Sequence, residues 1–227
     1  MEKKNISISK KARYFQLGKI SEQTKTIWFV FHGYGMLSQY FIKKFNSLEN
    51  NHTVIISPEA LSRFYIGENY DRVGASWITK EDKIDDIEDN INYLNSLFKS
   101  ITKNIDLNSI NIHVLGFSQG GATACRWILN SNIKINSLGL WGADIPIDCL
   151  SENNRGKWNQ FKTTLIVGKK DEFISEENKA KFAKLLNSYR LKYDLIEYDG
   201  THKIIEEVLI DYIQKYEQSA VRISGFK

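Results

Sequence analysis

Short runs rich in β-branched and aromatic residues alternate with helix-like patterns along this chain of 227 residues. Such runs are typical of buried strands, and a strand followed repeatedly by a helix predicts a mostly parallel sheet with helices on both faces. Residues 6–18 are expected to add an antiparallel strand at one edge. The other expected strands are residues 27–31, 53–57, 110–115, 137–141, 164–167 and 193–198.

The clearest expected helix is residues 80–101, where apolar residues recur every three or four positions and charged or amide residues occupy the other face. Thr79 is its expected N-cap, because a hydroxyl there can accept a hydrogen bond from the first turn. Ser175 is expected to cap a later helix in the same way. The other expected helices are residues 119–130, 175–189 and 203–216.

Length and composition favour one α/β domain over residues 1–227. Hydrophobic residues make up 42% of the chain and aromatic residues 12%, which is enough for a substantial core. The chain has only two prolines, and it contains no repeat and no stretch rich in proline, glycine and serine. Nothing in the sequence therefore marks a domain boundary.

Charge and cysteine usage argue against several classes of protein. The formal charge is +4 and the basic residues are scattered, so nucleic acid is not an expected partner. Cys125 and Cys149 form neither a metal-ligand spacing nor a disulfide framework, so no metal is expected and a reduced compartment fits. Residues 1–11 lack the apolar region of a signal peptide, and residues 27–31 are far too short to span a bilayer. We therefore expect a cytoplasmic protein without a membrane span.

The sequence GFSQG at residues 116–120 lies between an expected strand and an expected helix, and it matches the nucleophile-elbow pattern. In this pattern the serine occupies a strained turn that exposes its hydroxyl above the strand ends. The flanking glycines are needed because side chains there would collide with neighbouring backbone. Gly121 is expected to extend the close packing of the helix. Ser118 is therefore the candidate nucleophile.

A serine hydroxyl needs a base, and the base needs an acid that orients it; after such an elbow the chain order is serine, acid, histidine. His202 is the only histidine after Ser118, and it lies between the last expected strand and the last expected helix. We therefore take His202 as the candidate base. We interpret His32 as a structural residue of its loop, His52 as a surface residue and His113 as a strand residue.

Asp171 is the candidate acid, because it follows the strand expected at residues 164–167 and a glycine turn. Glu172 is an adjacent rival. Asp144 follows the strand expected at residues 137–141, where the acid is found less often in proteins with such an elbow. Asp199 is so close in sequence to His202 that we expect it to shape the loop instead.

Two backbone N–H groups are candidates for an oxyanion hole. Gln119 begins the helix after the elbow, where N–H groups point toward a negative charge forming beside Ser118. The second donor is expected from the glycine-containing loop at residues 30–36, and Tyr34 is the best candidate there.

Together these residues resemble the phospholipase/carboxylesterase branch of the α/β-hydrolases, which includes bacterial carboxylesterases and acyl-protein thioesterases. The resemblance spans residues 26–216. It implies an α/β-hydrolase fold and a cofactor-independent serine hydrolase of small-molecule esters or thioesters, with Ser118, Asp171 and His202 as its triad. The matching motifs are His32-Gly33-Tyr34-Gly35, Gly116-Phe117-Ser118-Gln119-Gly120-Gly121, Gly168 with Asp171, and Gly200-Thr201-His202.

The chain departs from this branch at one place. Members often carry a tryptophan, an aromatic residue and an aspartate before the first long helix, whereas this chain has Trp77-Ile78-Thr79. The resemblance therefore implies the chemistry but not the shape of the substrate pocket. Candidate pocket residues are Met36, Leu37, Phe64, Tyr65 and Trp77, although core packing is an equal expectation for Trp77. Cys125 is expected to be a buried small hydrophobe.

The sequence favours a carboxylesterase and leaves several alternatives open. An acyl-protein thioesterase, a lysophospholipase or a peptidase could use the same triad. A protein of another class, a non-catalytic binding module, could keep the hydrolase fold. The sequence does not determine the oligomeric state.

Overall fold

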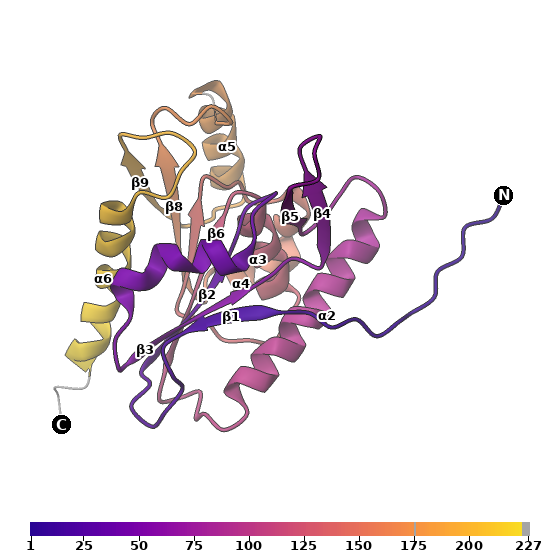
Figure 1. Cartoon of the computed structure of the whole chain (residues 1–227). Coiled ribbons are helices and arrows are strands. Elements are labelled where there is room, and N and C mark those ends of the chain that lie inside the picture. The colour runs from indigo at the N-terminus through magenta and orange to yellow at the C-terminus, as the bar shows by residue number, and fades with distance from the viewer. Residues whose placement is uncertain (175, 224–227) are drawn as a thin grey trace.

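The computed structural model describes residues 1–174 and 176–223, and its centre is a sheet of seven strands (Figure 1). The strand order is β1-β3-β2-β6-β7-β8-β9. Strand β1 pairs antiparallel with β3, and all other neighbours in this sheet are parallel. The strands are β1 Tyr14–Leu17, β2 Thr26–Phe31, β3 Thr53–Pro58, β6 Asn111–Phe117, β7 Ser137–Trp141, β8 Lys162–Gly168 and β9 Asp194–Tyr198.

The predicted α/β architecture is confirmed, including the antiparallel edge strand. Each of the six runs that predicted a strand overlaps one of the parallel strands. Strands β2 and β3 are buried along their whole length. This explains their continuous apolar character, since a parallel strand covered on both faces has no solvent-facing side.

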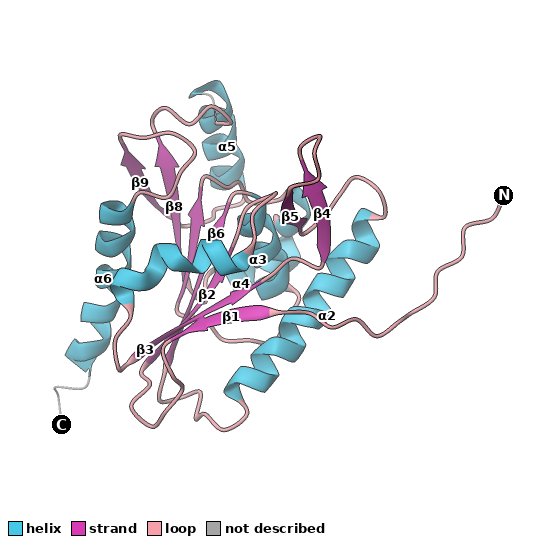
Figure 2. Ribbon diagram, in the orientation of Figure 1, coloured by secondary structure: helices cyan, strands magenta, loops and turns pink. Residues whose placement is uncertain are grey.

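A second, two-stranded sheet was not predicted. Strands β4, Ser62–Ile66, and β5, Arg72–Ser76, pair as an antiparallel hairpin (Figure 2). Both strands carry an exposed arginine, and Gly74 interrupts β5, so neither reads as a regular strand. The hairpin is joined to the loop after β2, where Ala75 N–H donates to the Met36 carbonyl and Gly35 N–H donates to the Ala75 carbonyl.

Helices cover both faces of the central sheet (Figure 2). Side chains of α2, α3, α4 and α5 belong to the hydrophobic cluster on one face, and those of α1, η1 and α6 belong to the cluster on the other. None of the helices in the described ranges is long and apolar enough to cross a membrane. The helices are α1 Ser38–Phe41, η1 Ile42–Leu48, α2 Lys83–Thr102, α3 Gln119–Leu129, η2 Ile147–Cys149, α4 Glu152–Trp158, α5 Glu176–Ser188 and α6 Glu206–Ile223.

The four longer helices confirm the predictions, but the N-cap assigned to Thr79 is wrong. Helix α2 begins at Lys83, and the capping position is Asp82, whose backbone is left-handed with φ of 51°. The Thr79 hydroxyl donates instead to the Glu81 carbonyl, and the Thr79 N–H donates to the Asp86 carboxylate. These local hydrogen bonds compete with the helix and delay its start. The other predicted cap, Ser175, lies outside the described residues.

Candidate active site

The carboxyl ends of the parallel strands meet at one edge of the sheet, and Ser118 lies there between β6 and α3. Its φ of 52° and ψ of −124° are uncommon for a residue other than glycine. The Ser118 N–H donates to the Trp141 carbonyl at the end of β7, at 2.9 Å. The predicted sharp turn is therefore present, and the neighbouring strand holds it in place.

Gly116 and Gly120 are required by close backbone packing. A Cβ on Gly120 would lie 2.5 Å from the carbonyl oxygens of Phe31 and His32, and one on Gly116 would lie 2.6 Å from the Gly121 nitrogen. These separations are shorter than any that a real Cβ adopts. The predicted collision with neighbouring backbone is therefore present, and the elbow brings α3 against the end of β2.

His202 and Asp171 come together from two loops at this edge. The His202 Nδ1 lies 2.8 Å from the Asp171 Oδ2, and the other carboxylate oxygen accepts the Phe173 N–H at 3.0 Å. The Asp171 side chain is fully buried and that of His202 is 12% exposed. Because a carboxylate only accepts hydrogen bonds, Nδ1 carries the proton and Nε2 is left as the acceptor.

Two aromatic rings and a glycine shape the space around the His202 ring. Its centroid lies 4.9 Å from that of Phe117 and 4.8 Å from that of Phe173. Gly142 follows β7 with φ of 54°, and a Cβ there would lie 3.0 Å from the His202 Nδ1 and 3.3 Å from the Asp171 Oδ2. This glycine allows the histidine and the acid to reach the strand end that also binds Ser118.

In the part of the chain that the structure describes, no hydrogen bond joins the Ser118 hydroxyl to the His202 ring. Their neighbours place them at the same edge, because the Phe117 ring contacts His202 and Phe117 directly precedes Ser118. Catalytic hydrogen bonds are often long before substrate binds and tighten afterwards.

The three rival acids do not contact the His202 ring as Asp171 does. Glu172 is exposed and accepts the backbone N–H of His202 at 3.3 Å; its own N–H and that of His202 lower the pKa of this carboxyl. Partial burial raises the pKa of Asp144, and the nearby Asp171 carboxylate raises it further. Asp199 is exposed and forms an ion pair with Lys170 at 2.8 Å.

The Gln119 N–H has no acceptor within its own helix, because it lies in the first turn of α3. Two hydrogen bonds fix the Gln119 side chain: its Oε1 accepts the Trp77 N–H at 3.0 Å, and its Nε2 donates to the Ile78 carbonyl at 2.8 Å. The segment after β5 therefore holds the residue that follows the nucleophile.

The loop that carries Tyr34 lies beside the nucleophile. A Cβ on Gly33 would lie 3.3 Å from the Ser118 Cβ, so the chain immediately before Tyr34 passes next to this residue. The Tyr34 ring is 62% exposed and stacks on Phe64 at 5.2 Å between centroids. This arrangement fits the role predicted for the Tyr34 N–H.

The candidate pocket residues have different environments. Trp77 is 1% exposed and its indole N–H donates to the His32 carbonyl at 2.9 Å, which favours core packing. Leu37 is also buried, whereas Tyr65 is 62% exposed and packs edge-on against Tyr70. Met36 is half-buried in the loop beside the elbow.

Phe173 was missed by sequence reasoning. It is 70% exposed, yet its ring packs edge-on against His202 and its N–H orients the Asp171 carboxylate. Its position two residues after the candidate acid was the available signal.

The loop position of His32, the exposure of His52, the strand position of His113 and the burial of Cys125 agree with the predictions. His32 is fully buried, His113 lies in β6 and contacts the Ser137 hydroxyl at 2.7 Å, and His52 is exposed. Both cysteines are buried, which raises the pKa of each thiol, that of Cys149 to about 12. Within the described ranges no group of three or more His, Cys, Asp or Glu residues is placed to hold a metal ion.

Comparison with known proteins points to one family. The phospholipase/carboxylesterase family model matches residues 17–218. The fold is similar to that of acyl-protein thioesterase 2 from Zea mays, with a TM-score of 0.69 and 16% identity over 92% of this chain and 99% of that one. It is also similar to the Bacillus cereus carboxylesterase, with a TM-score of 0.64 and 12% identity over 92% of this chain and 94% of that one. No curated protein matches.

Proposed function

The chain belongs to the phospholipase/carboxylesterase family of α/β-hydrolases, and we propose that it is a serine esterase that cleaves carboxylic esters of small molecules. The observation that carries the proposal is the 2.8 Å contact between the buried Asp171 carboxylate and the His202 ring, at the sheet edge where Ser118 occupies its strained turn. A histidine held in this way keeps Nε2 free to accept a proton.

In the proposed reaction, His202 Nε2 takes the proton of the Ser118 hydroxyl as its oxygen attacks the acyl carbon of the ester. The same proton then passes to the departing alcohol, and the acyl group stays on Ser118. Water attacks this acyl-enzyme, gives one proton to His202 and releases the carboxylic acid as Ser118 regains its proton. Asp171 holds the ring and stabilises its protonated form.

The proposed oxyanion hole uses the N–H groups of Gln119 and Tyr34. Each tetrahedral intermediate carries a negative charge on the former carbonyl oxygen, and fixed donors stabilise that charge without reorganising during the reaction. The positions of Gln119 at the head of α3 and of Gly33 beside Ser118 support this assignment.

A thioesterase is the second candidate, because the same triad attacks thioesters and the fold is similar to that of the maize acyl-protein thioesterase. A series of oxygen esters and thioesters with increasing acyl chain length separates the two. Higher kcat/KM for oxygen esters supports the esterase, whereas a preference for long-chain thioesters favours the alternative.

The direct test uses a fluorophosphonate probe, which reacts with activated serines. We expect a single label on the wild-type protein, and we expect Ser118→Ala to abolish both labelling and hydrolysis of short p-nitrophenyl esters. Ser96→Ala is the matched control, since Ser96 is an exposed serine on α2 and should leave both unchanged. A folded wild-type protein that takes no label would favour a non-catalytic binding module.

A further inference from the structure

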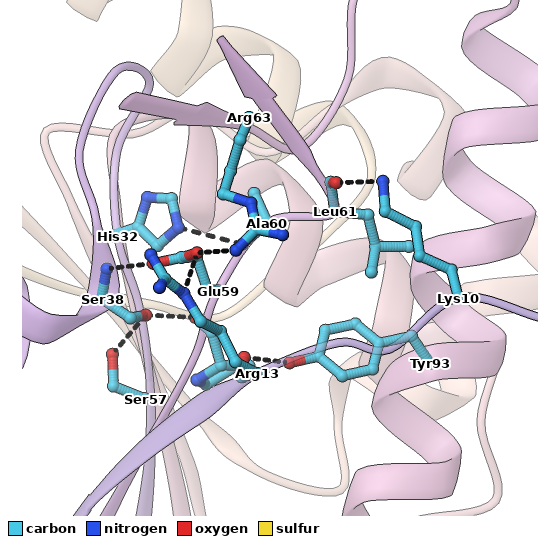
Figure 3. Close-up of polar contacts among 11 residues, drawn as sticks. Lys10, Arg13, His32, Ser38, Ser57, Glu59, Ala60, Leu61, Arg63 and Tyr93 are labelled. Atoms are coloured by element: carbon cyan, nitrogen blue, oxygen red, sulfur yellow. Dashed lines mark hydrogen bonds and ion pairs between the residues drawn. The ribbon is translucent and has the colours of Figure 1, made fainter. Parts of the chain in front are cut away.

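Two acidic residues are buried in the described part of the chain, and only one of them belongs to the proposed triad. Asp171 is 6% exposed, and Glu59, which directly follows β3, is 2% exposed. Burying a carboxylate is costly unless it is paired and hydrogen-bonded, so the surroundings of Glu59 require an explanation. Figure 3 shows these surroundings.

Arg13 is the main partner of Glu59 (Figure 3). Its guanidinium makes a two-pronged contact with the carboxylate, with Nε 2.6 Å from Oε1 and Nη2 3.1 Å from Oε2. The Arg13 backbone is fixed as well, because its carbonyl accepts the Glu59 N–H at 3.1 Å and the Tyr93 hydroxyl at 2.9 Å. Arg63 adds a second positive charge at 3.7 Å from Oε1. The ion pair thus joins the residue before β1 to the end of β3.

The remaining contact of the carboxylate reaches the loop beside Ser118. Glu59 Oε2 accepts the Ser38 N–H at 3.3 Å. The Ser38 hydroxyl, which is fully buried, donates to the Pro58 carbonyl at 2.6 Å and lies 3.0 Å from the Ser57 hydroxyl. The later end of the loop at residues 32–38 is therefore tied to the end of β3.

The earlier end of the same loop is tied to the next residue of that segment. His32 Nε2 accepts the Ala60 N–H at 3.1 Å, so its Nδ1 carries the proton and donates to the Gly33 carbonyl at 2.8 Å. Residues 57–60 thus hold the loop at both ends, with Gly33 and Tyr34 between them. The middle of the loop is held separately, because the Gly35 N–H and the Met36 carbonyl bond to Ala75 of the hairpin, and the Met36 N–H donates to the Gly33 carbonyl.

We propose that Glu59, paired with Arg13, is a positioning residue that fixes this loop so that the Tyr34 N–H meets the oxyanion. The inference rests on the proposed hydrolase function. Glu59 touches no reacting atom; it acts through Ser38 on the placement of a backbone donor. Displacement of such a donor by a fraction of an ångström weakens stabilisation of the intermediate more than it weakens substrate binding.

The test measures kcat and KM for a short p-nitrophenyl ester, and the rate of fluorophosphonate labelling, well below the Tm of each variant. In Glu59→Ala, kcat and the labelling rate should fall about tenfold while KM stays within about twofold. This loss is below the 10²–10³ typical for removal of an oxyanion donor, because the N–H is displaced and not deleted. Glu59→Gln should recover part of kcat, since its amide oxygen can still accept the Ser38 N–H.

Asp148→Asn is the matched control. It weakens another two-pronged ion pair, in which Arg126 of α3 contacts Asp148 of η2 at 2.7 and 2.8 Å and which involves none of residues 32–38 or 57–60. Asp148→Asn should lower Tm but leave kcat unchanged. A loss of kcat in the Glu59 variants could then not be attributed to a general loss of stability. Should Glu59→Ala fail to fold, Glu59→Met takes its place beside Glu59→Gln, because methionine fills a similar volume but cannot accept the Ser38 N–H. The same loss of kcat is expected.

A wild-type kcat in Glu59→Gln and in either Glu59→Ala or Glu59→Met overturns the inference, whatever the Tm of these variants. An equal loss of kcat in Asp148→Asn also overturns it. Both results leave the proposed function intact as long as labelling depends on Ser118. A wild-type protein without Ser118-dependent labelling counts instead against the proposed function itself.

Discussion

His32 and His202 lie on opposite sides of Ser118 in the sheet order, one after β2 and the other after β9, yet their surroundings differ completely. His32 is fully buried and contacts only backbone groups through its ring nitrogens, those of Gly33 and Ala60. His202 is partly exposed and contacts a carboxylate. The first arrangement holds a loop, and the second suits an imidazole that gains and loses a proton.

The electrostatics follow from these contacts. Burial lowers the pKa of His32 and outweighs the opposing effects of the Gly33 carbonyl and Glu59. The ring therefore stays neutral, as its role of accepting one hydrogen bond and donating another requires. His202 has a carboxylate that can stabilise its protonated form, which is what a general base needs. The role of each histidine therefore follows from the groups that its ring contacts, not from its position in the sequence.

The largest expected effect concerns the contact between Asp171 and His202. Asp171→Asn should lower kcat about 10⁴-fold, because an amide in place of the carboxylate favours the wrong tautomer of the ring. Asp144→Asn, which changes the neighbouring carboxyl, should alter kcat by no more than a few-fold. Steady-state kinetics of the two variants decide between these acids. A greater loss in Asp144→Asn would reverse the assignment.

A smaller effect concerns histidines that stay neutral in the folded protein. Burial lowers the pKa of His113 to about 4, whereas the unfolded chain protonates this ring near pH 6.5. Between these values the unfolded state binds one more proton than the folded state. The contribution of His113 to the free energy of unfolding is therefore complete above pH 6.5 and is lost as the pH is lowered to about 4. The contribution of His113 is about 3 kcal/mol at most.

Denaturant unfolding at several pH values measures this dependence. His113→Gln should flatten it, although His32 contributes in the same direction and part of the slope will remain. His52→Gln, which changes an exposed histidine, should leave the slope as in the wild type. A slope that His113→Gln leaves unchanged would mean that the ring is already protonated in the folded state.

The smallest effect concerns the hydrogen bond between Trp77 and the His32 carbonyl. Trp77→Phe removes the indole N–H that donates to the His32 carbonyl, and it should lower the free energy of unfolding by about 1–3 kcal/mol, since that oxygen is left unpaired. Because Trp77 is buried, KM should not change. Thermal unfolding measures the change in stability, and steady-state kinetics measure KM. A raised KM at unchanged stability would indicate that Trp77 lines the substrate pocket.

The elbow was predictable because its requirements are local. A serine with positive φ between a strand and a helix leaves no room for a Cβ at Gly116 or Gly120. This steric requirement produces a recognisable pattern in five consecutive residues. The places of Asp171 and His202 after successive strands followed from the order in which parallel strands bring their ends to one edge.

Other features depended on partners far away in the chain. The start of α2 at Lys83 reflects competition by local hydrogen bonds around Thr79 that the apolar spacing does not report. The β4–β5 hairpin is joined to the loop after β2, and Trp77 is buried by that same loop. Phe173 could not be placed against His202 before two loops were brought together.

The sequence by itself determined the alternation of strands and helices, the sharp turn at Ser118 and the chain order of its candidate partners. Periodicity and steric fit act over a few neighbouring residues, so they can be read from residue types alone. Only the tertiary structure decided that Glu59, 46 positions from Arg13, is buried as its partner, and that His32 bonds to backbone while His202 bonds to a carboxylate. Such pairings depend on which surfaces the packed core brings together and removes from water.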